Sequence, residues 1–575
     1  MANNYGVLLI FLFPVLGGII GFFLGKKDKG TRNDWIDIVV IVQLAMLAYL
    51  AYMTIGKGET FELSLGSFLG LGLSLTMDVV TVLLSILTTV IVAIVTQFMK
   101  ESMKKEESSN RFYLLFMCTF GMVLGACMTD NLFNFFMFIT LALLFAWPLI
   151  MHRRDRMALR NANIYIGFVT AGMVLILTGI VILFGYLGSV NYSGMYSSII
   201  SRGGSGALLI GGLLTSLGFA MTAGVFPVQF QVTRGCSYGL IEISTVLSSL
   251  ISKLVIYGIL VIAVDLFVDN KFYGRILLVA ALMTAIWGLL VTLSATDIRK
   301  ILMGIDVATN GFNLLAVSLL VLGGSSNQYG VRSVVYLLFA GALSIAVLYM
   351  VSLELVRRNQ TYEIKGLVAA GKGNPLLGAA TLLAGASLAG VPGTLGYLGY
   401  AILFKSISTG VGWKWLVVVY IILWGLLMTA VLRIFMKFFV SKPEEALRIL
   451  TSEEEQLVGE NSLEEKGKDD HKAYRFGEVL LLLAGIAQVI MGIIPQWTAN
   501  REEVINKFIT FCNMNETVHL DINVLSKSIL LAVGIAVLLC IVFYTNLVHG
   551  ILLRVIRNRK NKKLKEEAEQ NKENM

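Results

Sequence analysis

Ala223-Gly224-Val225-Phe226-Pro227 and Ala389-Gly390-Val391-Pro392-Gly393 place the same Ala-Gly-Val run before a proline in two apolar segments. The chain has seven prolines, and only these two follow such a run. Proline interrupts a helix, and in hydrocarbon the freed backbone groups are costly unless protein or a water-filled cavity satisfies them. Paired breaks at corresponding places are typical of an ion or substrate path through a membrane protein. We therefore predict two broken helices, at Gly224 to Pro227 and at Gly390 to Pro392.

The composition is that of a chain that lies mostly within a membrane. Hydrophobic residues make up 56% and charged residues 14% of its 575 residues, and the mean hydropathy is +0.78, more than a soluble core of this size requires. A helix needs about 20 apolar residues to span the hydrocarbon layer. We predict an all-α polytopic membrane protein with fifteen apolar segments, at 5–25, 34–55, 76–99, 111–129, 131–151, 162–187, 207–232, 239–266, 273–295, 300–322, 332–355, 376–404, 414–440, 476–495 and 526–548.

Basic clusters fall on alternate loops between these segments. They are Lys26 to Lys29, Lys100 to Lys105, His152 to Arg156, Arg299 with Lys300, Arg357 with Arg358, and Arg554 to Lys565. All lie on one side of the membrane if the N-terminus is outside, which is the positive-inside rule. The net charge of +9 therefore reflects topology, and we predict no nucleic-acid partner. We expect a multi-pass protein of the cell membrane with a retained first helix, an outside N-terminus and a cytoplasmic C-terminal tail that faces lipid.

The sequence carries no pattern for a cofactor or a metal. The five cysteines have no C-x-x-C spacing, and the four histidines lie in loops or at segment ends, so no zinc, iron–sulfur or haem site is predicted. No glycine-rich phosphate loop stands between a strand and a helix. We predict no cofactor, no metal and no catalytic centre in this chain. A redox reaction that drives it would take place in another chain.

A long stretch around the first break resembles a known family. It runs from Met221-Thr-Ala-Gly-Val-Phe-Pro-Val-Gln-Phe-Gln-Val-Thr-Arg to Ser244-Thr-Val-Leu-Ser-Ser-Leu-Ile-Ser-Lys253. It is similar to the antiporter-like subunits shared by Mrp-type cation/proton antiporters, respiratory complex I and membrane-bound energy-converting hydrogenases. Leu75-Thr-Met-Asp78, Thr296-Asp297-Ile-Arg-Lys and the run around the second break resemble further motifs of that family. The likeness covers most of the chain.

The resemblance implies a core of about fourteen transmembrane helices that contains two inverted five-helix repeats. The repeats would occupy 111–266 and 273–440, after an N-terminal three-helix region at 1–110. The remaining parts would be a charged cytoplasmic loop at 441–475, C-terminal helices at 476–553 with one helix added to the core, and a basic cytoplasmic tail at 554–575.

This chain departs from the family at most of the positions that carry protons. Family members carry a Glu on the fifth helix and a Lys on the seventh, and these positions are Thr140 and Thr222 here. They carry a His and a Lys on the eleventh helix, where this chain has Gly341 and Ile345, and a Lys on the twelfth, where it has Tyr400. The lysine of the eighth helix is kept as Lys253. Threonine cannot titrate, so the two threonines either order water or a cation with their hydroxyls, or simply pack and bond to carbonyls of their own helices.

Lys253 lies near the middle of its segment, where burial without a counter-charge is costly. Asp306 is unusual for the family and shares a polar face with Asn310 one turn later. We expect Asp306 to partner Lys253, the alternative being a carboxylate bonded locally. Glu242 lies three turns before Lys253 and either reaches it through water or a bridging group, or serves as a carboxylate at the helix N-terminus. We expect no acidic partner from the fifth helix, and we expect Asp130 to cap that helix.

The ion-pathway candidates are therefore Lys253, Asp306, Glu242, Thr140, Thr222, Asn310 and Tyr400. We predict an antiporter-like subunit of a redox-driven ion-translocating complex of the energy-converting hydrogenase or complex I type, with a degraded proton path and a structural or coupling role. The alternatives are a Mrp-type sodium/proton antiporter subunit and a membrane-anchoring partner of a separate soluble enzyme module. The expected partners are other membrane subunits, with protons or sodium ions as the transported species.

Overall fold

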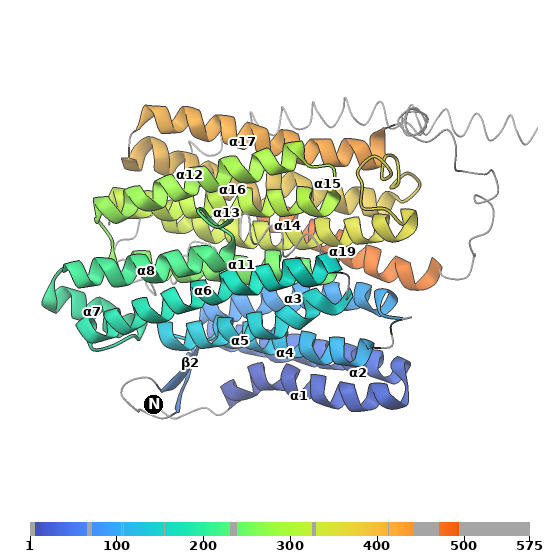
Figure 1. Cartoon of the computed structure of the whole chain (residues 1–575), viewed down its shortest axis with the longest axis horizontal. Coiled ribbons are helices and arrows are strands. Elements are labelled where there is room, and N and C mark those ends of the chain that lie inside the picture. Colours follow the sequence, from blue (N-terminus) through green and yellow to red (C-terminus); the bar gives the residue numbers. More distant parts are fainter. Residues whose placement is uncertain are drawn as a thin grey trace, which may run out of the picture. The chain divides into compact units, whose positions relative to one another are not determined.

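Long helices form nearly all of the computed structural model (Figure 1). It describes residues 6–65, 72–104, 106, 108–153, 156–229, 239–324, 329–411, 413–441 and 471–493. The described residues of Met1–Gly390 and Thr394–Thr517 pack as one unit, whereas Val391–Gly393 group with a second unit whose other residues, Val518–Met575, lie outside the described part. Most of the predicted loop at 441–475, the added helix at 526–548 and the tail at 554–575 also lie outside it.

The N-terminal region contains three long helices and a short hairpin that the all-α prediction missed. The helices are α1 (Gly6–Lys27), α2 (Lys29–Ala51) with the π-helical turn η1 (Tyr52–Gly56), and α3 (Val79–Ser102). Strands β1 (Phe61–Leu65) and β2 (Leu73–Met77) pair antiparallel. The Asp78 carboxylate accepts a hydrogen bond from the Thr81 N–H, and the Thr81 hydroxyl accepts one from the Asp78 N–H. This capping box fixes the start of α3.

The next helices lead to the first break. They are α4 (Ser109–Cys127), α5 (Leu132–Ile150) with the short η3 (Met151–Arg153), α6 (Arg156–Leu187), α7 (Tyr192–Arg202) and α8 (Gly206–Ala223). The cap of α5 is Asn131, whose Oδ1 accepts a hydrogen bond from the Phe133 N–H at 2.8 Å. The prediction that Asp130 caps this helix is wrong by one residue. The backbone carbonyl of Asp130 is instead held by the N–H of Tyr192 at 3.0 Å.

The second half of the chain begins with a helix that contains a π-helical segment. This helix consists of α10 (Ile241–Val246), η4 (Leu247–Ile251) and α11 (Ser252–Leu266). It is followed by α12 (Lys271–Ser294), α13 (Ile298–Gly323), α14 (Tyr329–Asn359), α15 (Pro375–Ala389), α16 (Leu395–Lys405) with η6 (Ser406–Val411), α17 (Lys414–Phe435) with η7 (Met436–Val440), and α19 (His471–Ile493).

Twelve helices in the described part are long and apolar enough to cross a membrane. Together with the broken pair α15 and α16 and with α19, they account for fourteen of the fifteen predicted segments. An all-α polytopic membrane protein is therefore confirmed. The inverted relation between the two predicted repeats stays a prediction.

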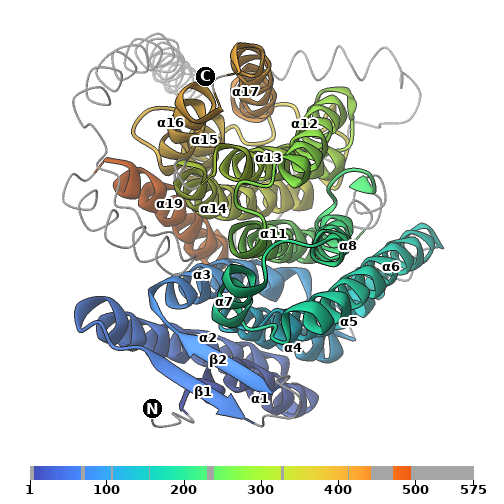
Figure 2. The same cartoon turned by 90° about the vertical axis from the view of Figure 1, so that its left-hand side faces the viewer.

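Two helices lie at the centre of the packed unit, enclosed by their neighbours (Figure 2). Ile241–Leu266 is buried along its whole length, and Ile298–Gly323 is buried along nearly all of it. Small residues let α13 approach α12 closely. A Cβ atom on Gly311 would lie 2.5 Å from the backbone nitrogen of Ala285, which shows how closely the two backbones approach. Because a central helix cannot meet water, each polar side chain on it needs a partner inside the protein.

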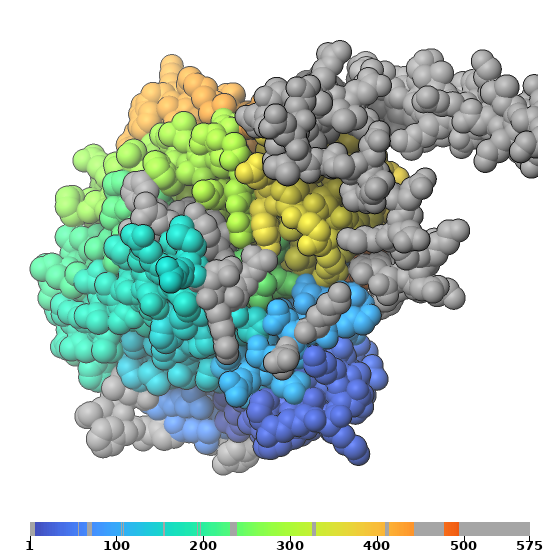
Figure 3. All heavy atoms as spheres, turned by 45° about the vertical axis from the view of Figure 1, so that its right-hand side comes forward, coloured from blue at the N-terminus to red at the C-terminus, as the bar shows by residue number. Residues whose placement is uncertain are grey.

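The end of α14 is tied to α19 and α3 by an ion-pair network. The buried Glu354 carboxylate accepts hydrogen bonds from Arg357 at 3.2 Å and Arg358 at 2.7 Å, and Arg358 also reaches Glu478 of α19 at 2.7 Å. Arg357 donates to the Ser102 hydroxyl of α3 at 2.8 Å. The space-filling view shows the yellow part of the chain beside the blue part, although the two lie far apart in the sequence (Figure 3). The network therefore fastens α19 to helices from distant parts of the chain.

Candidate ion-pathway site

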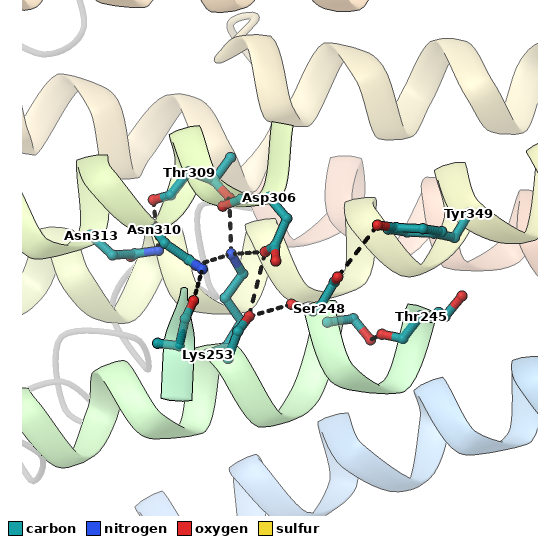
Figure 4. A network of polar contacts seen from close by, with 11 residues as sticks. Thr245, Ser248, Lys253, Asp306, Thr309, Asn310, Asn313 and Tyr349 are labelled. Atoms are coloured by element: carbon teal, nitrogen blue, oxygen red, sulfur yellow. Dashed lines mark hydrogen bonds and ion pairs between the residues drawn. The ribbon is translucent and has the colours of Figure 1, made fainter. Parts of the chain in front are cut away.

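Lys253 lies on the first turn of α11 and is almost completely buried, with 1% of its surface exposed. Its ammonium group donates to the Asp306 carboxylate at 2.8 Å, to the Thr309 hydroxyl at 2.9 Å and to the Asn310 side-chain carbonyl. An ammonium group has three donors, so all three are used. We call these four residues the Lys253 cluster (Figure 4).

The Lys253 cluster is built by one face of α13. Asp306, Thr309 and Asn310 stand at positions i, i+3 and i+4 of that helix, so their side chains lie on one side. Asp306 is 2% exposed. The expected pairing of Lys253 with Asp306 is confirmed. The counter-charge of Lys253 therefore comes from α13, and no acidic side chain of α5 bonds to Lys253 among the described residues.

Both predicted breaks are real interruptions of a helix. Helix α8 ends at Ala223, and Gly224 follows in the left-handed conformation with φ 69°. Helix α15 ends at Ala389, and Gly390 follows with φ 70° before α16 begins at Leu395. Glycine takes this conformation without steric cost, which explains the glycine in both Ala-Gly-Val runs. Pro227 and Pro392, the prolines of the two predicted breaks, lie in the segments between helices.

Thr140 and Thr222, which stand where family members carry a titratable Glu and Lys, differ in their hydrogen bonding. The Thr222 hydroxyl donates to the Phe219 carbonyl of its own helix at 2.9 Å, as a packing hydroxyl does. The buried Thr140 hydroxyl has no hydrogen-bond partner among the described residues. Local bonding is therefore the correct interpretation for Thr222 and the wrong one for Thr140. Neither threonine is a hydrogen-bond partner of Lys253 in the described part.

Glu242 is buried at the start of α10, with 1% of its surface exposed. Both of its carboxylate oxygens lack a hydrogen-bond partner among the described residues. Glu242 therefore makes no direct bond to Lys253, as its position three turns away predicted. Hydroxyl side chains stand between the two on the same helix, at Thr245, Ser248, Ser249 and Ser252. Ser252 lies 3.4 Å from the Asp306 carboxylate, so this row of hydroxyls leads toward the Lys253 cluster.

Tyr400 lies beside a cavity that also touches the Lys253 cluster. The cavity has a volume of about 10 Å³, and its walls include Thr309, Gly341, Ser387 and Tyr400. The buried Ser387 hydroxyl has no hydrogen-bond partner among the described residues. A second cavity of about 20 Å³ is lined by Lys253 itself, with Thr88, Cys127 and Ser249 among its other walls. Each of the two cavities is therefore bordered by a residue of the Lys253 cluster.

We expect one ordered water in the cavity beside Tyr400. Its volume matches a single water, and the Ser387 hydroxyl offers an unsatisfied polar group, with the Thr309 hydroxyl at another wall. A high-resolution map of the intact protein in its complex should show this water, and the same map of Ser387→Ala should lose it. Density for the water that persists unchanged in Ser387→Ala would contradict the assignment of Ser387 as its anchor.

Two residues of this site were not among the sequence candidates. Thr309 was missed although it lies three residues after Asp306, a spacing that places it on the same helix face. Ser387 gave no sequence signal beyond its place one turn before the second break. Its role depends on the packing of α15 and α16 against α14, which brings Ser387 to the same cavity as Thr309 and which the sequence does not show.

The fold and the site define an antiporter-like membrane subunit. Residues 129–429 match the family described as NADH:quinone oxidoreductase/Mrp antiporter, TM, and the chain belongs to this family. It is 25% identical over 457 residues to a Na(+)/H(+) antiporter subunit of Bacillus subtilis (strain 168), covering 77% of this chain and 88% of that one. The resemblance stated from the sequence is confirmed.

Proteins with other names are similar to this chain as well. Hydrogenase-4 component B of Escherichia coli (strain K12) is 25% identical over 277 residues, which are 47% of this chain and 41% of that protein. A chain in the structure of the membrane-bound sulfane sulfur reductase (MBS), an archaeal respiratory membrane complex, has a similar fold. It aligns with this chain at a TM-score of 0.73 and 16% identity, over 88% of this chain and 100% of that one. This last likeness shows the fold.

Proposed function

We propose that this chain is the antiporter-like subunit of a redox-driven ion-translocating membrane complex, of the energy-converting hydrogenase or complex I type, in which it has a structural or coupling role. The observation that carries the proposal is the Lys253 cluster. It holds a closed ion pair whose three ammonium donors are all used. A proton that leaves Lys253 along these bonds can reach only Asp306, Thr309 or Asn310, and of these Asp306 alone titrates.

The residues on either side of the cluster support a degraded path. The positions where family members carry titratable groups hold Thr140, Thr222, Gly341, Ile345 and Tyr400. The Tyr400 ring lies beside that of Trp424 and packs edge-on against Phe312, as an aromatic core residue does. Long intervals between the cluster and the membrane surfaces would therefore have to be bridged by water.

A Mrp-type sodium/proton antiporter subunit is the second candidate. The long match to a Na(+)/H(+) antiporter subunit favours it. In that case protons or sodium ions would pass by way of hydroxyls, water, Asp306 and Lys253. In either role the partners would be other membrane subunits and lipid, in the cell membrane, with the N-terminus outside and the C-terminus in the cytoplasm. The basic residues at the C-terminal ends of α1 and α14 fit that orientation.

Ion uptake by the intact complex in proteoliposomes tests the proposal. The variant Lys253→Met with Asp306→Asn removes both charges without leaving one ion buried alone. We expect it to keep at least about half of the wild-type uptake, since a general acid–base step lost from an essential path would cost about 100-fold or more. Deletion of the whole subunit should abolish coupled uptake. Complete loss of uptake by the double variant in a fully assembled complex would overturn the structural role and favour the antiporter.

A further inference from the structure

The break at the end of α8 is held by two side chains from different helices. The last carbonyls of a helix have no donor within the helix, and the Ala223 carbonyl accepts a hydrogen bond from the Asn310 side-chain nitrogen at 3.4 Å. On the other side of Gly224, the Phe226 N–H donates to the Thr284 hydroxyl at 3.0 Å. Helix α13 therefore holds the carbonyl side of the break, and helix α12 holds the amide side.

Lys253 determines which way the Asn310 side chain points. A side-chain amide accepts at its oxygen and donates at its nitrogen. The oxygen of Asn310 accepts from the Lys253 ammonium group, so the nitrogen faces the Ala223 carbonyl. Figure 4 shows the lysine ammonium group between Asn310 on one side and Asp306 on the other. A hydrogen bond from a charged donor is stronger than one between neutral groups, so the ammonium group anchors this orientation.

We propose that Asn310 is a positioning residue through which the ammonium group of Lys253 holds the broken end of α8 in place. Thr284 serves the same break without any link to Lys253. Any displacement of the ammonium group from Asn310 would therefore loosen the carbonyl side of the break and leave the amide side held. The inference goes beyond the proposed function, because it requires no ion to pass through this chain.

Hydrogen exchange of the backbone amides of Gly224 and Val225, in the intact complex, tests the proposal, because the Gly224 N–H shares its peptide unit with the Ala223 carbonyl and the Phe226 N–H is held separately by Thr284. We expect Asn310→Leu to speed their exchange about fivefold to tenfold, the loss of about one net hydrogen bond. Lys253→Met with Asp306→Asn should have the same effect, although neither residue bonds to α8. Adding Asn310→Leu to that double variant should change nothing further, because the two act through one connection. Amides of α6 should exchange as in the wild type.

Thr284→Val is the matched control. It removes the hydrogen bond from the Phe226 N–H to Thr284, which does not depend on Lys253. The factor by which it speeds exchange should therefore multiply with the factor for the Lys253→Met and Asp306→Asn pair. The proposal is overturned if removing the charges leaves the amides of the break unchanged while Asn310→Leu speeds them. It is equally overturned if the effects of Asn310→Leu and of the charge removal multiply as those of Thr284→Val do.

Discussion

Replacing Lys253 alone by Met is expected to lower the free energy of unfolding by about 3–5 kcal/mol, because it leaves the buried Asp306 carboxylate without its partner. The two charged atoms are 2.8 Å apart, and each side chain is 2% exposed. Asp306→Asn alone should cost a similar amount by leaving the ammonium group unpaired. The measurement is thermal or denaturant unfolding of the purified protein in detergent or nanodiscs, together with the amount of folded protein recovered.

The double variant separates a broken ion pair from a general loss of packing. Lys253→Met with Asp306→Asn leaves no unpaired charge, and we expect it to recover most of the stability that either single change loses. Lys100→Met is the matched control, since Lys100 pairs with Asp37 at a partly exposed site where both side chains are about one quarter exposed. It should cost about 1 kcal/mol or less. Simple addition of the two single effects in the double variant would contradict a coupled pair.

The sequence was sufficient for the membrane-spanning helices and the breaks, but it identified only some of the side chains that meet between different helices. Apolar length alone located the spanning segments, and the Ala-Gly-Val run before proline located both glycine caps, Gly224 and Gly390. Asp306 could be named as the partner of Lys253 because an acidic residue on an apolar helix needs one. Ser387 could not be named, because its place at the same cavity as Thr309 depends on how α15 packs against α14.

Local rules also failed where two neighbouring residues compete for one role. Both Asp130 and Asn131 are good helix caps, and the choice fell to Asn131 because the backbone of Asp130 pairs with Tyr192. The hairpin of β1 and β2 was missed for a different reason. Apolar and polar residues do alternate in β1, Phe61-Glu62-Leu63-Ser64-Leu65, but a fold class inferred from composition and apolar length takes no account of so short a pattern.

Gly311→Val is expected to destabilise the protein by about 3 kcal/mol or more, because no space exists for a side chain between α12 and α13. A Cβ atom at Gly311 would lie 2.5 Å from the backbone nitrogen of Ala285, so one backbone must move. Since α13 carries Asp306, that movement would also pull the carboxylate away from Lys253. Unfolding of the variant measures the first effect, and hydrogen exchange at Gly224 and Val225 measures the second.

Gly167→Val in α6 provides the control for the change from glycine to valine. No atom lies within 4 Å of a Cβ placed there, so only helix propensity changes, by a few tenths of a kcal/mol in favour of valine. The same substitution is thus expected to destabilise the protein at Gly311, where α12 and α13 are in contact, and to be tolerated at Gly167. If Gly311→Val were as stable as Gly167→Val, the close approach of α12 and α13 would be wrong, and with it the packing that sets Asp306 against Lys253.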